Sequence, residues 1–379
     1  MASEHSELLK ASVTDFATRG TDIARVRALR SKPQEYDRAV WRQMAELGWL
    51  GILVPESYGG MGLGLTDTAV IAEGLARALV PEPFTSSAVL ATTALCASQN
   101  ETLKRELLPA LVGGSSIATL AWQEEAGQLD HQHIAMRATP FEGGYRLTGT
   151  KKYVTGAAGA DLFIVAARTD AGLVLGCMER ETSGVSVELQ ALADGRHFAT
   201  VTFDDAVVQR ERVAAQGSDA EDALACAIDR ATAIASAELY GVMCRTLEMS
   251  VDYMKTRVQF GKPIGSFQAL QHRAVDLYIQ QQLASAVLNE ALRELDRDPA
   301  PPRRAALVSR MKARCSDAGV RIGREAIQIH GAIGFTDEYD AGLYLKRALV
   351  LGAWLGTATQ HRRRYAALTL SAASSREVP

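Results

Sequence analysis

The sequence has few of the features that mark secreted, metal-binding or membrane-spanning proteins. Its 379 residues contain only five cysteines, widely scattered, and no Cys-x-x-Cys pair, so a disulfide framework or a structural zinc site is not expected. The first ten residues lack the apolar core of a signal peptide, and no run approaches the roughly 20 apolar residues that a membrane span requires. We therefore expect a cytoplasmic protein with no membrane partner.

Strong charge and two common catalytic patterns are also missing. The formal net charge is −3, which gives no electrostatic reason to bind nucleic acid. No Gly-x-Ser-x-Gly occurs, and the glycine-rich stretch 59–64 lacks the Lys-Ser/Thr of a P-loop, so we expect it to be a flexible loop. His131 and His133 are too small a set for a metal site and are expected to be exposed.

What the sequence does contain is enough apolar material, 47% over 379 residues, for one large core or several smaller ones. Residues 1–115 have the periodicity of helices, residues 116–217 form short strand-like runs between turns, and residues 218–379 return to long helical segments. Connections within the middle part are too short for crossover helices, so we expect an antiparallel, barrel-like β-domain. Helices, a β-domain and a four-helix-type bundle in that order predict an α+β fold.

Several individual helices can be predicted from apolar spacing. Val40, Met44 and Leu47 recur at helical spacing and are expected to share a buried face, and Gly48 is placed to end that helix. Three further helices are expected over residues 220–257, 268–295 and 304–329. The polar tail, residues 371–379, is expected to be disordered.

The motif most indicative of chemistry is Arg257-Val-Gln-Phe-Gly-Lys-Pro-Ile-Gly-Ser-Phe-Gln268. An arginine at a helix end beside a glycine turn offers a forked donor that suits a pyrophosphate. Phe260 could pack on an adenine ring or on a neighbouring subunit. Taken alone, the same stretch also fits a helix end followed by an ordinary turn.

Two further stretches carry glycines at turns. In Gln328-Ile-His-Gly-Ala-Ile-Gly-Phe335, glycine would let backbone amides approach phosphate oxygens without a Cβ in the way. Gly149-Thr-Lys-Lys-Tyr-Val-Thr-Gly156 places an aromatic, an aliphatic and a threonine at the end of an expected strand. Plain strand residues would give the same pattern.

In series, these stretches resemble acyl-CoA dehydrogenases, and the resemblance covers essentially the whole chain. It implies bound FAD, with the first two stretches reaching the adenine and pyrophosphate of the FAD held by the neighbouring subunit of a dimer. It implies that Tyr153 packs against the isoalloxazine ring and that Thr155 hydrogen-bonds near N5. The residues that it assigns to the cofactor are Arg257, Gln259, Phe260, Phe267, Gln268, Gln328, Gly331, Ala332, Tyr153, Thr155 and Thr357.

The resemblance fails at the catalytic base. Family members commonly have a glutamate before Gly-Thr, but this chain reads Trp354-Leu355-Gly356-Thr357, and leucine cannot accept a proton. Some members carry the glutamate on the long helix instead, where this chain has Ala231. The segment that usually contacts flavin and thioester is also altered, to Gln123-Glu-Glu-Ala-Gly-Gln-Leu-Asp130. No catalytic residue can therefore be assigned.

The stretches expected to reach the FAD of a neighbouring subunit are complete, and we call them the half-site, whereas the catalytic base is missing. This combination resembles the small subunit of bacterial heteromeric acyl-CoA dehydrogenases, such as the pimeloyl-CoA or steroid side-chain types. This implies α,β-dehydrogenation of an acyl-CoA thioester, a related partner subunit in an α2β2 assembly, and electron-transfer flavoprotein as acceptor. Two alternatives remain open. The chain could be a homotetrameric flavoenzyme with another base or with monooxygenase chemistry, or a non-enzymatic scaffold.

Overall fold

The computed structural model describes residues 4–19, 23–30, 32, 36–297 and 300–374. They fall into two compact units. The helical unit comprises the described residues of Met1–Val26, Ala69–Val80 and Thr232–Pro379. The β-unit comprises those of Arg27–Thr68 and Pro81–Ala231. Helix α7 (Gly217–Thr256) runs from the β-unit into the helical unit.

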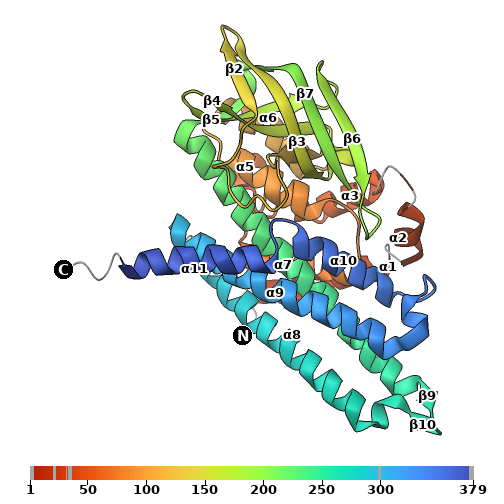
Figure 1. The fold of residues 1–379 in the computed structure, drawn as a ribbon. Helices are drawn as coiled ribbons and strands as arrows, with labels where there is room; N and C mark the ends of the chain where they lie inside the picture. The colour runs from red at the N-terminus through yellow and green to blue at the C-terminus, as the bar shows by residue number, and fades with distance from the viewer. Residues whose placement is uncertain (1–3, 20–22, 31, 33–35, 298–299, 375–379) are drawn as a thin grey trace. The chain divides into compact units, whose positions relative to one another are not determined.

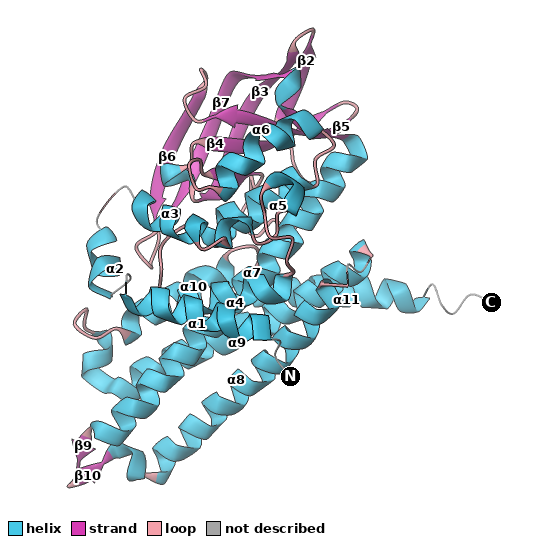
Figure 2. Ribbon diagram, turned by 180° about the vertical axis from the view of Figure 1, so that it is seen from behind, coloured by secondary structure: helices cyan, strands magenta, loops and turns pink. Residues whose placement is uncertain are grey.

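Long helices, one eight-stranded sheet and one two-stranded sheet make up the described fold, as predicted for an α+β protein (Figures 1 and 2). The other helices are α1 (Glu4–Arg19), α2 (Ile23–Leu29), α3 (Arg38–Glu46), α4 (Leu65–Arg77), α5 (Thr92–Cys96), α6 (Glu101–Val112), α8 (Gln268–Leu295), α9 (Pro301–His330), α10 (Ala341–Ala353) and α11 (Ala358–Ser374). The strands are β1 (Ala118–Ala121), β2 (Arg137–Phe141), β3 (Gly144–Thr155), β4 (Leu162–Thr169), β5 (Gly172–Glu179), β6 (Val185–Ala191), β7 (His197–Gln209), β8 (Val213–Gln216), β9 (Val258–Gln259) and β10 (Lys262–Pro263). A π-helix, η3 (Phe84–Ala91), precedes α5 and is buried throughout.

The sheet of the β-unit is mostly antiparallel, with strand order β6-β7-β3-β2-β4-β5-β8. Strand β1 departs from the prediction, because it pairs with β4 in parallel, with Ala118 opposite Leu162. The expectation rested on short connections, but the β2–β3 hairpin lies between β1 and β4 and makes that connection long enough for a parallel return.

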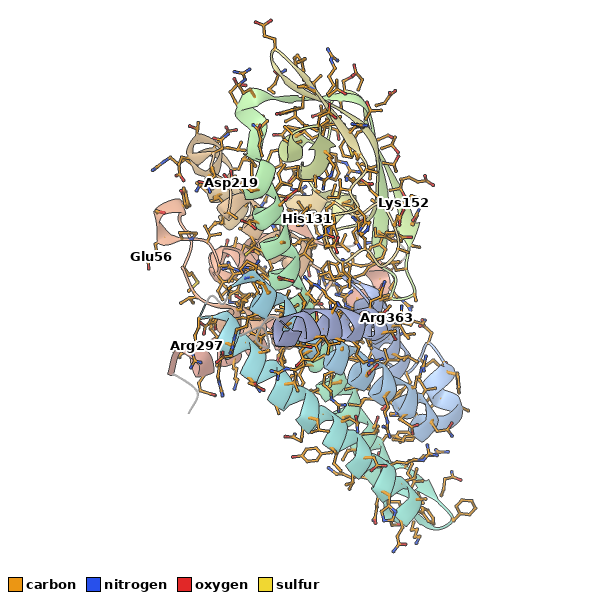
Figure 3. The ribbon with its side chains drawn as sticks, turned by 60° about the vertical axis from the view of Figure 1, so that its left-hand side comes forward. Glu56, His131, Lys152, Asp219, Arg297 and Arg363 are labelled. Atoms are coloured by element: carbon orange, nitrogen blue, oxygen red, sulfur yellow. The ribbon has the colours of Figure 1, made fainter. Side chains whose placement is uncertain are left out.

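The core of the β-unit lies against this sheet. Phe163 and Val165 of β4 and Val201 and Phe203 of β7 are almost fully buried. Their β-branched and aromatic side chains suit a pleated, buried surface. On β3 the side chain of Lys151 is buried, whereas the next residue, Lys152, is exposed and points outward (Figure 3).

Helix α3 confirms part of the predicted buried face and corrects one residue. The Asp37 carboxylate caps the helix by accepting from the Ala39 N–H at 2.8 Å. Val40 and Met44 are buried as predicted, but Leu47 is 42% exposed. The helix ends at Glu46, so Leu47 no longer lies on its face, and Gly48 continues the turn with a φ of +77°.

The long helices of the helical unit agree with their predicted ranges. Helices α7, α8 and α9 cover the stretches expected at 220–257, 268–295 and 304–329 to within a few residues, and α8 and α9 lie side by side (Figure 1). The tail differs, because α11 continues through Ser374, whereas residues 375–379 lie outside the described part. No helix among the described residues is long and apolar enough to cross a membrane.

The glycine-rich loop after Pro55 is held by backbone hydrogen bonds. The Met61 N–H donates to the Gly51 carbonyl at 2.9 Å, and the Leu63 N–H donates to the Ile52 carbonyl at 2.8 Å. At Gly60 a Cβ would lie 2.1 Å from the Val54 carbonyl oxygen, so the loop depends on this close backbone approach.

Candidate functional site

The Arg257–Gln268 stretch forms a small hairpin at the end of α7. The helix ends at Thr256, and β9 and β10 pair Gln259 with Lys262. Phe260 and Gly261 form the tip, with φ angles of +51° and +78°. Left-handed φ is uncommon for phenylalanine, so the turn presents that side chain at an energetic cost of about 1–2 kcal/mol.

The side chains of this hairpin project outward. Phe260 is 91% exposed, and its ring meets that of Phe267 edge-on with centroids 6.1 Å apart. The Lys262 ammonium lies 4.4 Å from the centroid of the Phe267 ring. Within the described part of the chain, the Arg257 guanidinium has neither a hydrogen bond nor an ion pair. The forked donor of Arg257 is therefore available to an external anion.

The second stretch begins in the last turn of α9. Gln328 is exposed, and Gly331 ends the helix with a φ of +64°. A Cβ built at Gly331 would have no heavy atom within 4 Å, so the Cα of this glycine borders open space, while its N–H donates to the Ile327 carbonyl. Ala332 follows in the exposed turn η7 (Gly331–Phe335), and Phe335 is 83% exposed.

His330 brings the two stretches together. Its ring stacks on that of Tyr253 with centroids 4.5 Å apart, and Tyr253 lies on α7 one turn before Arg257. Nδ1 donates to the Ala326 carbonyl at 2.7 Å, which leaves Nε2 to accept from the Tyr339 hydroxyl at 3.0 Å. Burial lowers the pKa of His330, so the neutral ring suits this arrangement.

Sequence reasoning missed the positioning role of His330. The signal was available, because a histidine directly before a helix-ending glycine is well placed to pack on a neighbouring helix end. The aromatic partners Tyr253 and Tyr339 lie in other elements, and only the fold shows that they meet.

Leu355 occupies the usual base position, and the structure offers no substitute there. Its side chain is 1% exposed and its φ is +57°. His361 Nε2 donates to the Leu355 carbonyl at 2.8 Å, and Nδ1 accepts from the Ser309 hydroxyl at 3.3 Å. Ala231, the alternative base position, is fully buried on α7. Neither position supplies a proton acceptor.

Tyr153 and Thr155, the predicted flavin-facing pair, lie at the end of β3 in the β-unit. The pairing of β3 with β7 is irregular between Lys151 and Val154, and Tyr153 lies in this bulge with a φ of +57°. Its ring meets that of Phe198 edge-on with centroids 5.9 Å apart. The structure thus gives Tyr153 an unusual, fixed backbone, while contact with a flavin remains a prediction.

The altered segment that begins at Gln123 is tied to the protein rather than free for substrate. The Glu124 carboxylate accepts from the Lys151 ammonium at 2.6 Å and from the Ala135 and Met136 amides. Burial alone would raise the pKa of Glu124, but the Lys151 charge and these hydrogen bonds lower it. Glu124 is therefore an anchored anion and a poor candidate for the missing base.

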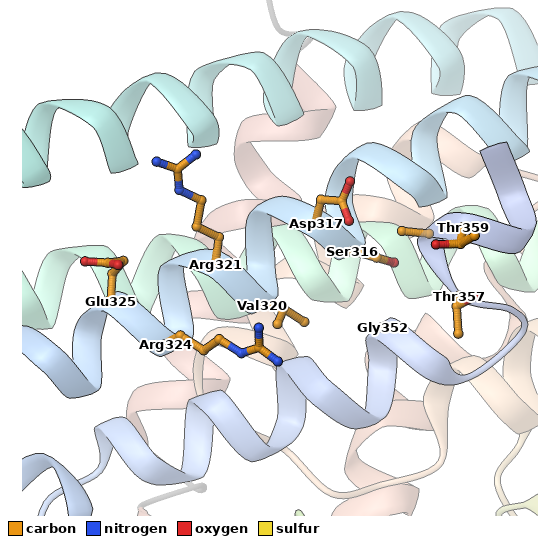
Figure 4. A pocket seen from close by; sticks show the side chains of 10 residues that line it. Ser316, Asp317, Val320, Arg321, Arg324, Glu325, Gly352, Thr357 and Thr359 are labelled. Carbon is orange, nitrogen blue, oxygen red and sulfur yellow. The ribbon is translucent and has the colours of Figure 1, made fainter.

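A groove of about 380 Å³ runs between α9 and the junction of α10 with α11 (Figure 4). Thr357, one of the predicted cofactor residues, lines it as the N-cap of α11. The Thr357 amide and hydroxyl both donate to the Gln360 side-chain oxygen, at 2.9 and 2.8 Å. Leu355 is two residues away but buried, so the groove and the base position are separate features.

Comparison with known proteins decides the family. The acyl-CoA dehydrogenase N-terminal domain matches residues 3–115, and the acyl-CoA dehydrogenase C-terminal domain matches residues 225–369. Acyl-CoA dehydrogenase IpdE2 of Mycolicibacterium smegmatis is 30% identical over 96% of this chain and 98% of its own length. This chain belongs to the acyl-CoA dehydrogenase family. Acyl-CoA dehydrogenases are FAD-dependent oxidoreductases that act on acyl-CoA, which confirms the predicted enzyme class and cofactor at the level of the family.

Two solved structures similar to this acyl-CoA dehydrogenase are of particular interest. The ChsE4–ChsE5 complex of Mycobacterium tuberculosis matches with a TM-score of 0.88 at 28% identity, over 100% of this chain and 99% of the matched chain. The steroid acyl-CoA dehydrogenase Tcur3481–Tcur3483 also matches with a TM-score of 0.88 at 28% identity, over 98% and 99% of the two chains. Each of these two names joins two different proteins.

Proposed function

We propose that this chain is the base-lacking subunit of a heteromeric acyl-CoA dehydrogenase, and that it completes the FAD site of a related subunit carrying the glutamate. The observation that carries the proposal is the contrast between Leu355 and the outward-facing hairpin. The base position is buried and apolar, whereas Arg257 is exposed and its guanidinium has no partner in the described chain.

The residues present suit an FAD diphosphate. A guanidinium offers only hydrogen-bond donors, and a diphosphate offers only acceptors. Gln328, Gln259 and Gln268 are exposed and can donate beside the guanidinium, and Phe260 offers a ring for adenine. Their outward direction fits a cofactor held by another subunit.

The chemistry explains why a partner is needed. Dehydrogenation removes a proton from the α-carbon of the thioester while a hydride leaves the β-carbon. FAD, when bound, accepts that hydride. The α-proton is weakly acidic, so a positioned carboxylate is needed, and its loss costs about 10²–10⁴-fold in rate. Since Leu355 and Ala231 cannot act, the proton must go to a residue of the partner.

The substrate class and the electron acceptor extend the same proposal. A solved structure whose name refers to a steroid acyl-CoA dehydrogenase supports a bulky acyl group, such as a ring-bearing acyl-CoA. Electron-transfer flavoprotein is the proposed acceptor, and the cytoplasm the proposed location. Division into domains at residues 1–115, 116–217 and 218–379 is likewise a proposal.

The half-site is tested by Arg257→Gln in the complex with its partner subunit. We expect the assembly to persist while its affinity for FAD falls roughly tenfold or more, because a charge-assisted hydrogen bond contributes about 1.5–3 kcal/mol. Arg363→Gln is the matched control, since Arg363 is also an exposed arginine without a partner in the described chain. Flavin content of the chain purified alone completes the test. A full complement of FAD without a partner would instead establish a homo-oligomeric flavoenzyme.

A further inference from the structure

The β-unit contains a cavity that none of the sequence motifs identifies. Its volume is about 550 Å³, and it lies between the start of α3 and the turn that joins β3 to β4. Its lining includes Leu29, Lys32, Tyr36, Ala158, Asp161 and Arg180. All of these residues belong to the β-unit, and none is assigned to the cofactor. Cavities of this size are typical of small-molecule sites.

The two carboxylates of the cavity are already paired within the protein. The Arg38 guanidinium donates to both oxygens of Asp161, at 3.0 and 2.6 Å, and to the Gly159 carbonyl at 2.9 Å. Asp161 also accepts from the Ile117 N–H at 2.9 Å. The other carboxylate, Asp37, is the N-cap of α3. Neither acid is left to balance a further positive charge.

Two cations at the cavity lack such partners. Lys32 is exposed, and its ammonium has no hydrogen bond or ion pair within the described part of the chain. Arg180 is held through Nη1, which donates to the Ala157 carbonyl, while Nη2 has no acceptor among the described residues. Its Nε lies 4.0 Å from the carboxylate of Glu181, whose side chain is 93% exposed, so that pair is weak. The cavity therefore carries a net positive charge and free donors.

The rest of the wall is apolar and fixed. Leu29, Ala158 and the ring of Tyr36 supply carbon surface beside the two cations. Tyr36 is 8% exposed, and a Cβ built at Gly159 would lie 2.1 Å from its hydroxyl oxygen, so the ring is held against the backbone of the turn. Apolar surface beside free cations suits an anion with an apolar body.

We propose that this cavity binds a small organic carboxylate. The fork of Arg180 matches the two oxygens of a carboxylate, and Lys32 adds a second donor. The apolar body of the ligand lies against Leu29, Ala158 and Tyr36. A bare phosphate satisfies the cations but leaves this wall uncovered, so a carboxylic acid with a ring or a short chain fits better. The inference does not depend on the proposed function, because the cavity shares no residue with the half-site.

Binding of 1-naphthoate to the full chain, measured by titration calorimetry, is the test. We expect one site per chain. 1-Naphthamide has the same rings without the charge and should bind at least about tenfold more weakly. Inorganic phosphate at equal concentration should not displace the naphthoate. This comparison uses the natural chain, so it does not depend on the folding of any variant.

Variants locate the site. Arg180→Gln should weaken naphthoate binding roughly tenfold or more, because a charge-assisted hydrogen bond is lost. Ala158→Phe should abolish binding by filling the cavity. Lys152→Gln replaces an exposed lysine of β3 that does not line the cavity, and as the control it should leave binding unchanged. Absence of naphthoate binding, equal binding of naphthamide, or equal effects of Arg180→Gln and Lys152→Gln would overturn the proposal.

Discussion

At the scale of single residues, Leu355 has a left-handed backbone conformation, which residues with a Cβ disfavour. A leucine at a φ of +57° costs about 1–2 kcal/mol relative to ordinary helical backbone. The conformation persists because the side chain is buried and His361 holds the carbonyl. The loop therefore keeps a fixed geometry although the side chain has no catalytic group.

Restoring a carboxylate at this position tests whether the rest of the substrate site is present. We expect Leu355→Glu to leave the isolated chain without acyl-CoA oxidation, because Glu124 and its segment are anchored to the protein. The measurement is flavin bleaching by acyl-CoA without oxygen, with Leu355→Gln as the control of equal size. A gain of about 10²–10⁴-fold over Leu355→Gln would show a complete site in one chain.

His361 links this loop to a pH dependence of stability. Burial, followed by the charge of Lys312, lowers the pKa of His361 to about 3. Between the ordinary histidine pKa of about 6.5 and this value, the unfolded chain binds a proton that the folded chain does not. The contribution of His361 is complete above pH 6.5 and is lost as pH falls, by about 1.4 kcal/mol per pH unit.

Urea unfolding at pH 7.5, 6.5 and 5.5 measures this effect. The free energy of unfolding should fall more steeply with acid in the natural chain than in His361→Gln, which has no group that titrates there. The variant should also be less stable at pH 7.5 by about 1–3 kcal/mol, because the Leu355 carbonyl loses its buried donor. Parallel pH profiles for the two proteins would rule out this role of His361.

At the scale of secondary-structure elements, the ends of α7 and α9 form one assembly. Stacking of His330 on Tyr253 fixes the turn before Arg257 against the turn after Gln328. The two motifs are about 60 residues apart in sequence. Helix α8 lies between α7 and α9 in sequence and runs back along the unit, so that the C-terminal ends of α7 and α9 meet. A donated half-site of this kind depends on element packing as much as on the motif residues.

Two glycines inside helices should respond to alanine in opposite directions. In α7, a Cβ at Gly241 would lie 2.3 Å from the Glu73 carbonyl oxygen of α4, so Gly241→Ala should cost about 1–3 kcal/mol. In α10, Gly352→Ala meets only ordinary contacts and should raise stability by about 0.5–1 kcal/mol through helix propensity. Urea unfolding of both variants gives the signs, and equal signs would contradict the described packing.

Much of the element layout could be predicted from sequence, and the failures have physical causes. The long helices were predictable because their apolar spacing runs over many turns. The parallel pairing of β1 with β4 was not, because pairing between distant strands leaves no local pattern. Leu47 was wrongly predicted to be buried. Its spacing continues that of the apolar residues of α3, but the helix ends at Glu46, one residue before it.

The candidate site was predictable only in part. Motif residues such as Arg257 and Gln328 were found from sequence, and their role toward FAD stays a prediction. Lys32 and Arg180 carried no motif, because free charges beside a cavity become visible only when the surrounding elements are in place.

At the scale of the whole molecule, α8 carries an exposed apolar face that calls for a partner. Val275, Tyr278, Ile279 and Leu283 are 55%, 55%, 46% and 49% exposed and recur at helical spacing. We expect this face to be covered in the assembly, so Ile279→Glu should shift the protein toward smaller species in analytical ultracentrifugation. Ser186→Glu, an exposed change on β6, is the control and should leave the assembly intact. An unchanged sedimentation profile for Ile279→Glu would place the interface elsewhere.

We expect this chain to work as one half of a pair of different subunits. A native mass spectrum of the chain, isolated from its host with a gentle tag, tests this most directly. We expect a heterotetramer with a second acyl-CoA dehydrogenase-like subunit and one FAD for each pair of subunits. A homotetramer carrying one FAD in every subunit would contradict it.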